Sequence, residues 1–191
     1  MTRGLVEVFP IPILSESHAI VIVPTYNERD NLPTLAERVL NQPVAIDMLV
    51  VDDGSPDGTG DIADALAKKY PSIHVLHRAK KNGLGRAYCD GFRWALERDY
   101  EFIFEMDGDF SHTIVDLQNL IKFKDEFDLV IGSRYIKGGK TEGWSNGRKL
   151  LSITANKVAK ILLGTKVNDM TSGFRIYSNC LLYTSDAADE S

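Results

Sequence analysis

Two aspartates, Asp107 and Asp109, stand two residues apart with only Gly108 between them. They follow a largely apolar run, Tyr100 to Met106, that predicts a buried strand. Where a strand gives way to a loop, both carboxylates can turn toward one point, and paired hard oxygen donors suit Mg²⁺ or Mn²⁺. A metal held by only two carboxylates keeps open positions for the oxygens of a diphosphate. The alternative is a solvated turn in which the aspartates serve as caps.

A calcium-binding loop is the rival metal interpretation. The stretch that begins at Asp53 nearly fits an EF-hand loop, with matching residues at Ser55, Asp57, Gly58 and Asp64. However, residues 47–52 predict a strand where an EF-hand needs a helix, and Pro56 lies inside the loop. The sequence therefore favours the Asp107 and Asp109 pair as the metal site.

The length and composition are those of one soluble globular domain with a substantial core. The chain has 191 residues, of which 43% are hydrophobic and 26% are charged. A net charge of −5 argues against a nucleic-acid binder. Cys89 and Cys180 show no metal or disulfide spacing, which favours a reducing, cytoplasmic setting. We interpret residues 1–18, which lack a signal-peptide core, as a loosely ordered lead-in.

Strand and helix patterns alternate along most of the chain. Apolar, β-branched runs predict strands at 19–23, 46–51, 73–76, 100–106 and 129–131. Helical patterns lie between them at 32–40 with Asn31 as cap, at 57–69, after Asn82, and at 113–123. Such alternation predicts an α/β fold with a mainly parallel sheet flanked by helices, because each right-handed crossover needs a covering helix.

Polar clusters follow three of the predicted strands directly. They are Pro24 to Glu28, Asp52 to Ser55, and Asp107 to Ser111. Open α/β sheets bind ligands at the carboxyl ends of their strands, so we expect the three clusters to form one site.

After Ile131 the regular alternation stops. A glycine-rich stretch, 138–143, predicts a mobile loop. Residues 148–163 then predict an amphipathic helix that carries Lys149, Lys157 and Lys160 beside leucine, isoleucine and valine. Two interpretations remain open for it: a helix that covers the sheet, or one that lies near a membrane surface with its lysines toward anionic head groups.

Six motifs in this order carry a family resemblance. They are Val23 to Glu28, Val50 to Thr59, Gly83 to Tyr88, Met106 to His112, Gly132 to Tyr135, and Asp169 to Arg175. Together they resemble the family 2 inverting glycosyltransferases of the GT-A fold, a Rossmann-like nucleotide-diphospho-sugar transferase architecture. Within that family the chain is most similar to the dolichyl-phosphate (polyprenyl-phosphate) mannose synthases.

The resemblance implies a donor, an acceptor and a set of site residues. The donor would be GDP-mannose, the acceptor dolichyl or polyprenyl monophosphate, the metal Mg²⁺ or Mn²⁺, and the location the cytosolic face of a membrane. The nucleotide pocket would include Pro24, Tyr26, Glu28, Val51 and Asp53. The metal and the diphosphate would be held by Asp107, Gly108 and Asp109, with Ser111 where some relatives place a metal-facing glutamine and His112 behind the ligands. Phosphate would be held by Arg134 and Arg148, while Gly83 and Gly85 would serve packing.

The implied mechanism is an in-line displacement. A lipid phosphate has a second pKa of about 6, so at neutral pH it is mostly a dianion that needs orientation rather than a general base. The fork of an arginine matches phosphate geometry. An α-linked donor would give a β-linked product.

The C-terminal end departs from the family pattern. Domains of this family continue well past the motif that ends at Arg175, so we predict an incomplete domain over 19–179. Residues 180–191 resemble the translation of a sequencing adapter, and we interpret them as a non-native tail that cannot pack on the domain. We expect the chain as given to bind nucleotide but to be inactive.

Two other functions remain as alternatives. One is a family 2 transferase that uses another sugar nucleotide, such as UDP-glucose, on a lipid phosphate or glycan. The other is a receiver-like signalling domain, but a receiver needs an aspartate at the end of its third strand, where this sequence has His77 and Arg78.

Overall fold

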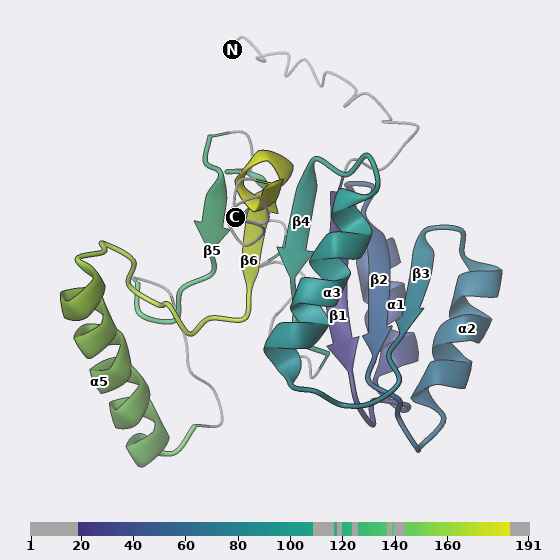
Figure 1. Cartoon of the computed structure of the whole chain (residues 1–191), viewed down its shortest axis with the longest axis horizontal. Coiled ribbons are helices and arrows are strands. Elements are labelled where there is room, and N and C mark those ends of the chain that lie inside the picture. The colour runs from purple at the N-terminus through teal and green to yellow at the C-terminus, as the bar shows by residue number, and fades with distance from the viewer. Residues whose placement is uncertain are drawn as a thin grey trace, which may run out of the picture.

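The architecture is a six-stranded mixed sheet with the strand order β3-β2-β1-β4-β6-β5 (Figure 1). This computed structural model describes residues 19–108, 117, 120–123, 126–136, 139 and 144–183. The strands are β1 (Ala19–Thr25), β2 (Asp47–Asp52), β3 (Ile73–His77), β4 (Phe102–Glu105), β5 (Leu129–Ile131) and β6 (Arg175–Ser178). The first four run parallel, as the sequence predicts, with Val23 opposite Val50 and Val21 opposite Phe104.

Helices cover both faces of the parallel half. In β1, Val21 and Val23 face a core shared with α1 (Leu32–Leu40) and α2 (Thr59–Lys69). Ile20 and Ile22 face the opposite core, shared with α3 (Leu84–Leu96). Successive side chains of a strand point to opposite faces, so a strand buried on both faces must be apolar throughout. This is why the sequence of β1 shows no alternation.

The sequence misses β6. This strand pairs antiparallel with β4 on one side and with β5 on the other, and Arg175 lies opposite both Glu105 and Ile131. Because β6 runs against its neighbours, its first residue lies at the edge where β4 and β5 end. The motif that precedes it, 169–174, is thereby brought to that edge.

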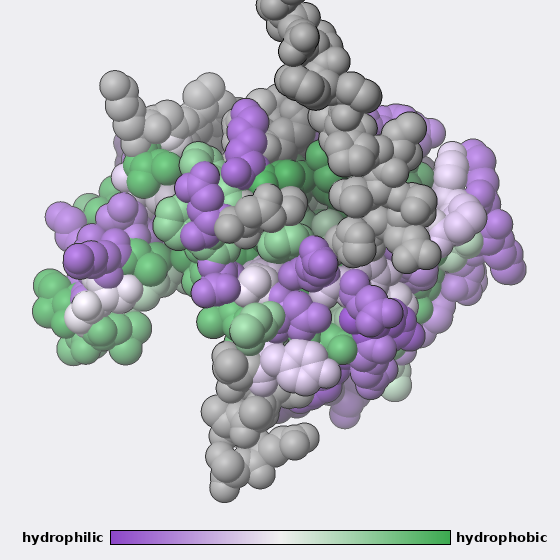
Figure 2. Space-filling view, turned by 90° about the horizontal axis from the view of Figure 1, so that it is seen from above, coloured by the Kyte–Doolittle hydropathy of each residue, from purple (hydrophilic) through white to green (hydrophobic). Residues whose placement is uncertain are grey.

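The helix α5 (Asn146–Leu163) stands away from the sheet (Figure 1). The interpretation of this segment as a cover for the sheet is therefore wrong. Its buried residue is Asn156, whereas its large apolar side chains are 50–81% exposed: Leu150, Leu151, Val158, Ile161, Leu162 and Leu163. Hydrophobic residues accordingly gather at the left end of the molecule in Figure 2, which α5 forms. Among the helices of the described residues, none is long and apolar enough for a membrane crossing.

Several local predictions need correction. Asn31 occupies the position before α1, but its side chain donates to Glu28 (2.7 Å) and makes no cap bond. A Cβ at Gly83 or Gly85 would meet nothing within 4 Å, so these glycines do not serve packing. The packing glycine is Gly91, where a Cβ would lie 2.7 Å from Cγ2 of Ile22.

Two predicted segments have a mixed outcome. Of the predicted helix at 113–123, residues 113–116, 118 and 119 lie outside the described residues, while Leu117 and Leu120 are buried in the core. Residues 179–183 form a short helical turn, and Leu182 packs on the α3 side of the core. The expectation that nothing after Asn179 packs on the domain is therefore wrong for Leu182.

Candidate active site

The carboxyl ends of β1 and β4 meet around Gly108. A Cβ placed on Gly108 would lie 3.6 Å from the carbonyl oxygen of Pro24 and 3.7 Å from Cγ of Glu28. Three predicted site residues, Pro24, Glu28 and Gly108, are thus brought together. The sheet topology therefore confirms that the clusters after these strands share one edge.

The loops after β1 and β2 are joined by hydrogen bonds. The backbone N–H groups of Asn27, Glu28 and Arg29 donate to Ser55 Oγ (3.1 Å), Thr59 Oγ1 (3.0 Å) and Asp57 Oδ2 (3.2 Å). Asn27 has a φ of 61°, so the chain turns sharply there. The Asp57 carboxylate accepts from Thr59, which lowers the pKa of Asp57. These hydrogen bonds hold the loops after β1 and β2 together. The second loop is not an EF-hand calcium loop, because the segment before it is the strand β2 and not a helix.

The predicted nucleotide residues fall into two groups. The Val51 side chain is fully buried under α3, so only its backbone can meet a ligand. Asp53 is buried and paired with Arg78, whose Nε donates to Asp90 of α3 (2.7 Å). Tyr26 is 37% exposed, and the Lys81 ammonium lies 3.8 Å from the centre of its ring. The Asp53 carboxylate is thus held in place by Arg78, while the Tyr26 ring is exposed enough for a ligand to contact it.

Asp107 lies in a close-fitting corner. Tyr88 of α3 donates to its Oδ1 (3.3 Å), and a Cβ on Gly173 would lie 2.9 Å from its Oδ2. Burial, and secondarily the Asp107 charge, raises the pKa of Tyr88, so the phenol keeps the proton that it donates. The other predicted metal residues, Asp109 and Ser111, lie outside the described residues, as does His112.

A divalent cation fits the chemistry of this corner. The Asp107 carboxylate is a hard oxygen donor at a strand end, and the absence of a side chain at Gly173 leaves room beside it. Within the described residues no three His, Cys, Asp or Glu side chains converge. Mg²⁺ is commonly held in proteins by one or two carboxylates and retains water and substrate oxygens, so the Asp107 carboxylate is a suitable ligand for it.

A second acidic group lies beneath the corner. Glu105 is buried, and its carboxylate is 3.8 Å from Nε of Arg175. Burial raises the pKa of Glu105, although the Arg175 charge opposes the rise. Arg175 in turn donates to the hydroxyl of Tyr177 (3.1 Å) and to the carbonyl of Met170 (2.7 Å). These bonds tie β6 and the preceding loop to the end of β4.

Arg134 follows β5 and is held by Asp169. Its Nε and Nη2 donate to the two carboxylate oxygens of Asp169 at 2.7 Å each, and its backbone N–H donates to the same group (3.1 Å). Nη2 also donates to Thr171 Oγ1 (2.7 Å). Burial alone would raise the pKa of Asp169, but the bonds from Arg134 outweigh it and hold that pKa below its ordinary value. Within the described residues, Nη1 is the guanidinium nitrogen without such a bond.

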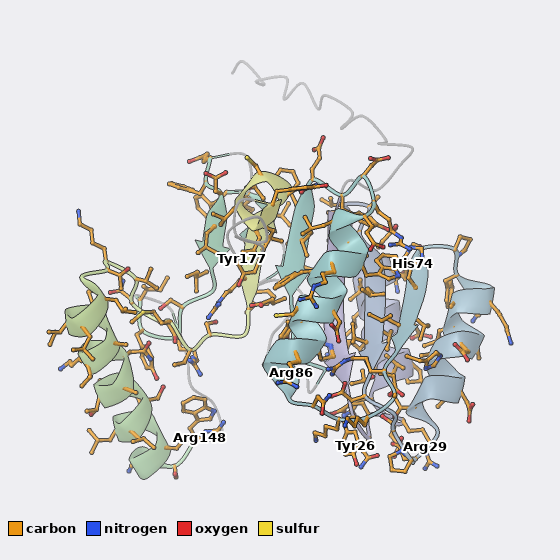
Figure 3. The ribbon with its side chains drawn as sticks, in the orientation of Figure 1. Tyr26, Arg29, His74, Arg86, Arg148 and Tyr177 are labelled. Atoms are coloured by element: carbon orange, nitrogen blue, oxygen red, sulfur yellow. The ribbon has the colours of Figure 1, made fainter. Side chains whose placement is uncertain are left out.

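Trp144 connects the two predicted phosphate-binding arginines. The guanidinium carbons of Arg134 and Arg148 lie 4.8 and 4.2 Å from the centres of its rings. In Figure 3, Arg148 lies at the lower end of α5, and Tyr26 and Arg29 lie at the lower end of the parallel half of the sheet. Two positive groups around one indole form an anion-binding arrangement, and the bonds to Asp169 together with the weaker effect of the Asp107 charge raise the pKa of the Arg134 guanidinium.

The comparisons with known proteins agree with this geometry. The family model described as glycosyl transferase family 2 matches residues 20–183. The chain belongs to glycosyl transferase family 2. Family membership confirms the fold and the resemblance that the motifs carry, and it excludes the receiver-like alternative.

This family 2 chain has close curated relatives. It is 48% identical over 158 residues to an undecaprenyl-phosphate mannosyltransferase of Micrococcus luteus. It is 47% identical over 170 residues to a polyprenol monophosphomannose synthase of Mycolicibacterium smegmatis, and 42% over 159 residues to a dolichol-phosphate mannosyltransferase of Pyrococcus furiosus. The matches cover 83%, 88% and 81% of this chain, but 65%, 64% and 44% of the relatives.

Solved family structures share the fold. Mannosyltransferase PcManGT from Pyrobaculum calidifontis, in complex with GDP-Man and Mn²⁺, superposes with a TM-score of 0.62 at 18% identity and covers 90% of this chain and 47% of its own. Glucosyl-3-phosphoglycerate synthase from Mycobacterium tuberculosis, with Mn²⁺, UDP and product, gives 0.62 at 19% identity, covering 86% and 58%. At such identities the likeness concerns the fold alone.

Sequence reasoning assigned no role to several residues that the structure brings into this candidate site. They are Tyr88, Trp144, Asp169, Thr171 and Gly173. Tyr88 reads as part of the buried stripe of a helix, and Trp144 as part of a loop. The polar run Asp169 to Ser172 was a pattern from which a functional role could have been inferred. Because β6 was not predicted, the sequence did not place this run at the carboxyl ends of β4 and β5.

Proposed function

We propose that this chain is the catalytic part of an inverting glycosyltransferase that moves mannose from GDP-mannose to a polyprenyl or dolichyl monophosphate. The names of its relatives at 42–48% identity support mannose as the sugar and a polyprenyl or dolichyl phosphate as the acceptor, and GDP-Man is bound in the complex of the structural neighbour PcManGT. The observation that carries the proposal is that the Asp107 carboxylate after β4 lies close enough to Arg134 after β5 to help Asp169 raise the pKa of Arg134, and that Arg148 is joined to Arg134 through Trp144. This arrangement offers one place for a metal-bound diphosphate and another for a second phosphate.

The donor half of the site is built on Asp107. We propose that Asp107 and Asp109 hold Mg²⁺ or Mn²⁺, with Ser111 close by and Gly108 beside the diphosphate. When bound, the metal neutralises the charge that develops on the departing nucleoside diphosphate. Pro24, Tyr26, Glu28, Asp53 and the backbone of Val51 form the nucleotide pocket. The joined loops after β1 and β2 keep this pocket preorganised, since three backbone N–H groups are fixed across it.

The acceptor half is built on Arg134. Asp169 accepts two hydrogen bonds from one edge of its guanidinium and leaves Nη1 for a phosphate oxygen. Arg148, on the same indole, supplies a second positive charge. A phosphate dianion oriented in this way attacks the anomeric carbon without a general base, and in-line attack inverts that carbon.

The exposed face of α5 suits a membrane surface. At roughly 100° per residue, Leu150, Ile161 and Val158 share one side of the helix, opposite the buried Asn156. Lys157 borders this apolar stripe, whereas Lys149 and Lys160 lie nearer the Asn156 side, where Lys160 Nζ donates to Asn168 (3.0 Å). We propose that α5 rests in the interface of the cytosolic leaflet, which would bring the lipid phosphate to Arg134.

The chain as given is expected to be inactive, so the test uses a version whose C-terminus is restored from a homologous gene. It measures transfer of labelled mannose from GDP-mannose to a polyprenyl phosphate in detergent, with Mn²⁺ present. We expect label in the lipid fraction, none with UDP-glucose as donor, and none with Asp107→Ala. The melting temperature should rise more with GDP and Mn²⁺ than with UDP and Mn²⁺, because the pocket is proposed to hold guanine. Protection by UDP and glucose transfer instead would establish the alternative family 2 activity.

A further inference from the structure

One side chain joins α5 to the rest of the protein in an unusual way. Asn156 is 5% exposed, in a helix whose large apolar residues face outward. An amide buried on the side opposite an apolar stripe is not explained by hydrophobic packing. Its hydrogen bonds indicate what it does.

Both ends of the Asn156 amide are used. Nδ2 donates to the carbonyl of Ser152 (3.0 Å) within α5 and to Thr171 Oγ1 (3.2 Å) outside it. Oδ1 accepts from the backbone N–H of Met170 (2.8 Å). The side chain therefore fixes the backbone of the 169–171 loop and one hydroxyl of that loop.

The Thr171 hydroxyl is saturated. It accepts from Asn156 Nδ2 (3.2 Å) and from Arg134 Nη2 (2.7 Å), and it donates to Asp169 Oδ1 (3.2 Å). A hydroxyl has one donor and two acceptor positions, so all of its capacity is used. A continuous path of hydrogen bonds thus runs from α5 to the guanidinium of Arg134.

We infer that Asn156 and Thr171 are positioning residues, which fix the plane of the Arg134 guanidinium according to how α5 is seated. Neither touches the reacting groups. They act on Nη2, so the Nη1 edge and the stack on Trp144 keep one orientation. The consequence for the lipid phosphate rests on the proposed function, whereas the effect on Arg134 and Trp144 does not.

The experiment compares Thr171→Val, which keeps the shape but removes the hydroxyl, with Thr171→Ser, which keeps the hydroxyl. Both are made in a Trp94→Phe background, so that Trp144 is the remaining tryptophan. We expect Thr171→Val and Asn156→Leu to change Trp144 fluorescence without any ligand, and Thr171→Ser to match the parent. The affinity for geranyl phosphate should fall about tenfold in Thr171→Val, as loss of a hydrogen bond to a charged group implies, and recover in Thr171→Ser. The melting-temperature rise with GDP and Mn²⁺ should stay the same.

Asn168→Ala is the matched control, because it removes another bond between α5 and the same loop, from Lys160 Nζ (3.0 Å), that does not lead to Arg134. It should leave fluorescence and affinity unchanged. Parental fluorescence in Thr171→Val, or an equal loss of affinity in Asn168→Ala, would overturn the inference. If the parent binds no geranyl phosphate while the fluorescence pattern holds, the positioning role stands and the acceptor assignment of the proposed function fails.

Discussion

Gly173 gives the sharpest test of the metal corner. In Gly173→Ala the new Cβ would lie 2.9 Å from Oδ2 and 3.3 Å from Oδ1 of Asp107, where ordinary contact begins at 3.4 Å. The carboxylate must therefore retreat by about 0.5 Å, whereas metal–ligand distances tolerate about 0.2 Å. The obstacle is the end of a side chain, which can rotate, so the fold itself loses little stability.

We expect affinity for Mn²⁺ in the presence of GDP to fall about 10- to 100-fold, as with other changes that reorient a metal ligand. The assay is a calorimetric titration of Mn²⁺ into the GDP-saturated protein, with thermal unfolding measured alongside. Unchanged Mn²⁺ affinity in a folded Gly173→Ala protein would refute the placement of the metal beside Asp107.

Two other glycines serve as matched controls. Gly85→Ala places its methyl in open space and should change neither metal affinity nor stability by much. Gly91→Ala places it 2.7 Å from Ile22 in the α3 core and should lower the free energy of unfolding by about 1–3 kcal/mol with Mn²⁺ affinity retained. A fall in Mn²⁺ affinity for all three variants would mean that the effect at Gly173 is general destabilisation.

Three further changes probe the charges of the site. In the enzyme with a restored C-terminus, Arg134→Lys keeps the charge but cannot both pair with the two oxygens of Asp169 and present a further N–H to phosphate, so transfer to lipid phosphate should fall steeply while the KM for GDP-mannose holds; wild-type values for both kinetic constants would contradict the phosphate role. Asp169→Asn should lower the free energy of unfolding by about 3 kcal/mol in denaturant titrations at neutral pH, because it leaves a mostly buried guanidinium without its partner. Since the folded pKa of Asp169 is depressed, the wild type should lose this advantage as pH falls below about 4, and a constant difference down to pH 2 would argue against the pairing. The folded pKa of Glu105 is raised, so the protonated carboxyl stabilises the fold below about pH 4.3, and this stabilisation is lost as the pH rises through the folded pKa. The melting temperature of Glu105→Gln should therefore lack the decline that the wild type shows over this pH range. Identical pH profiles of the two melting temperatures would show that Glu105 does not cause the decline.

The parallel half of the fold was predictable because its signals are local. Each of β1, β2 and β4 is an apolar run that ends in turn-forming polar residues, and the rule about carboxyl ends then places the Asp107 cluster beside Pro24 and Glu28. The boundaries differ by one or two residues, as at β1, which extends through Thr25.

The antiparallel half was not predictable for a physical reason. Of the four residues of β6 only Ile176 is buried. The side chains of its neighbours Arg175 and Tyr177 end in polar groups, and four residues are too few to show the alternation of apolar and polar residues that predicts a strand. The apolar stripe of α5 does not reveal what it packs against, because a helix face that binds a membrane has the same periodicity as one that packs on a sheet. The contacts of Arg134 with Asp169 span 35 residues and depend on β6, so no local pattern announces them.

The position of β6 also sets the order in which the protein can fold. Within the part of the chain that the structure describes, β5 pairs with β6 alone, and β6 arrives 47 residues later, counted from Ile131 to Ser178. At about 5–20 residues per second, a ribosome needs several seconds to make that segment. During this time the edge of β4 is unpaired, while β1, β2 and β3 can already associate with it. A nascent chain in this interval exposes a strand edge to aggregation, and it lacks both Gly173 beside Asp107 and Asp169 beside Arg134. Binding of a ligand at the corner of Asp107 and Arg134 should therefore appear abruptly, once β6 has been made, rather than grow with chain length.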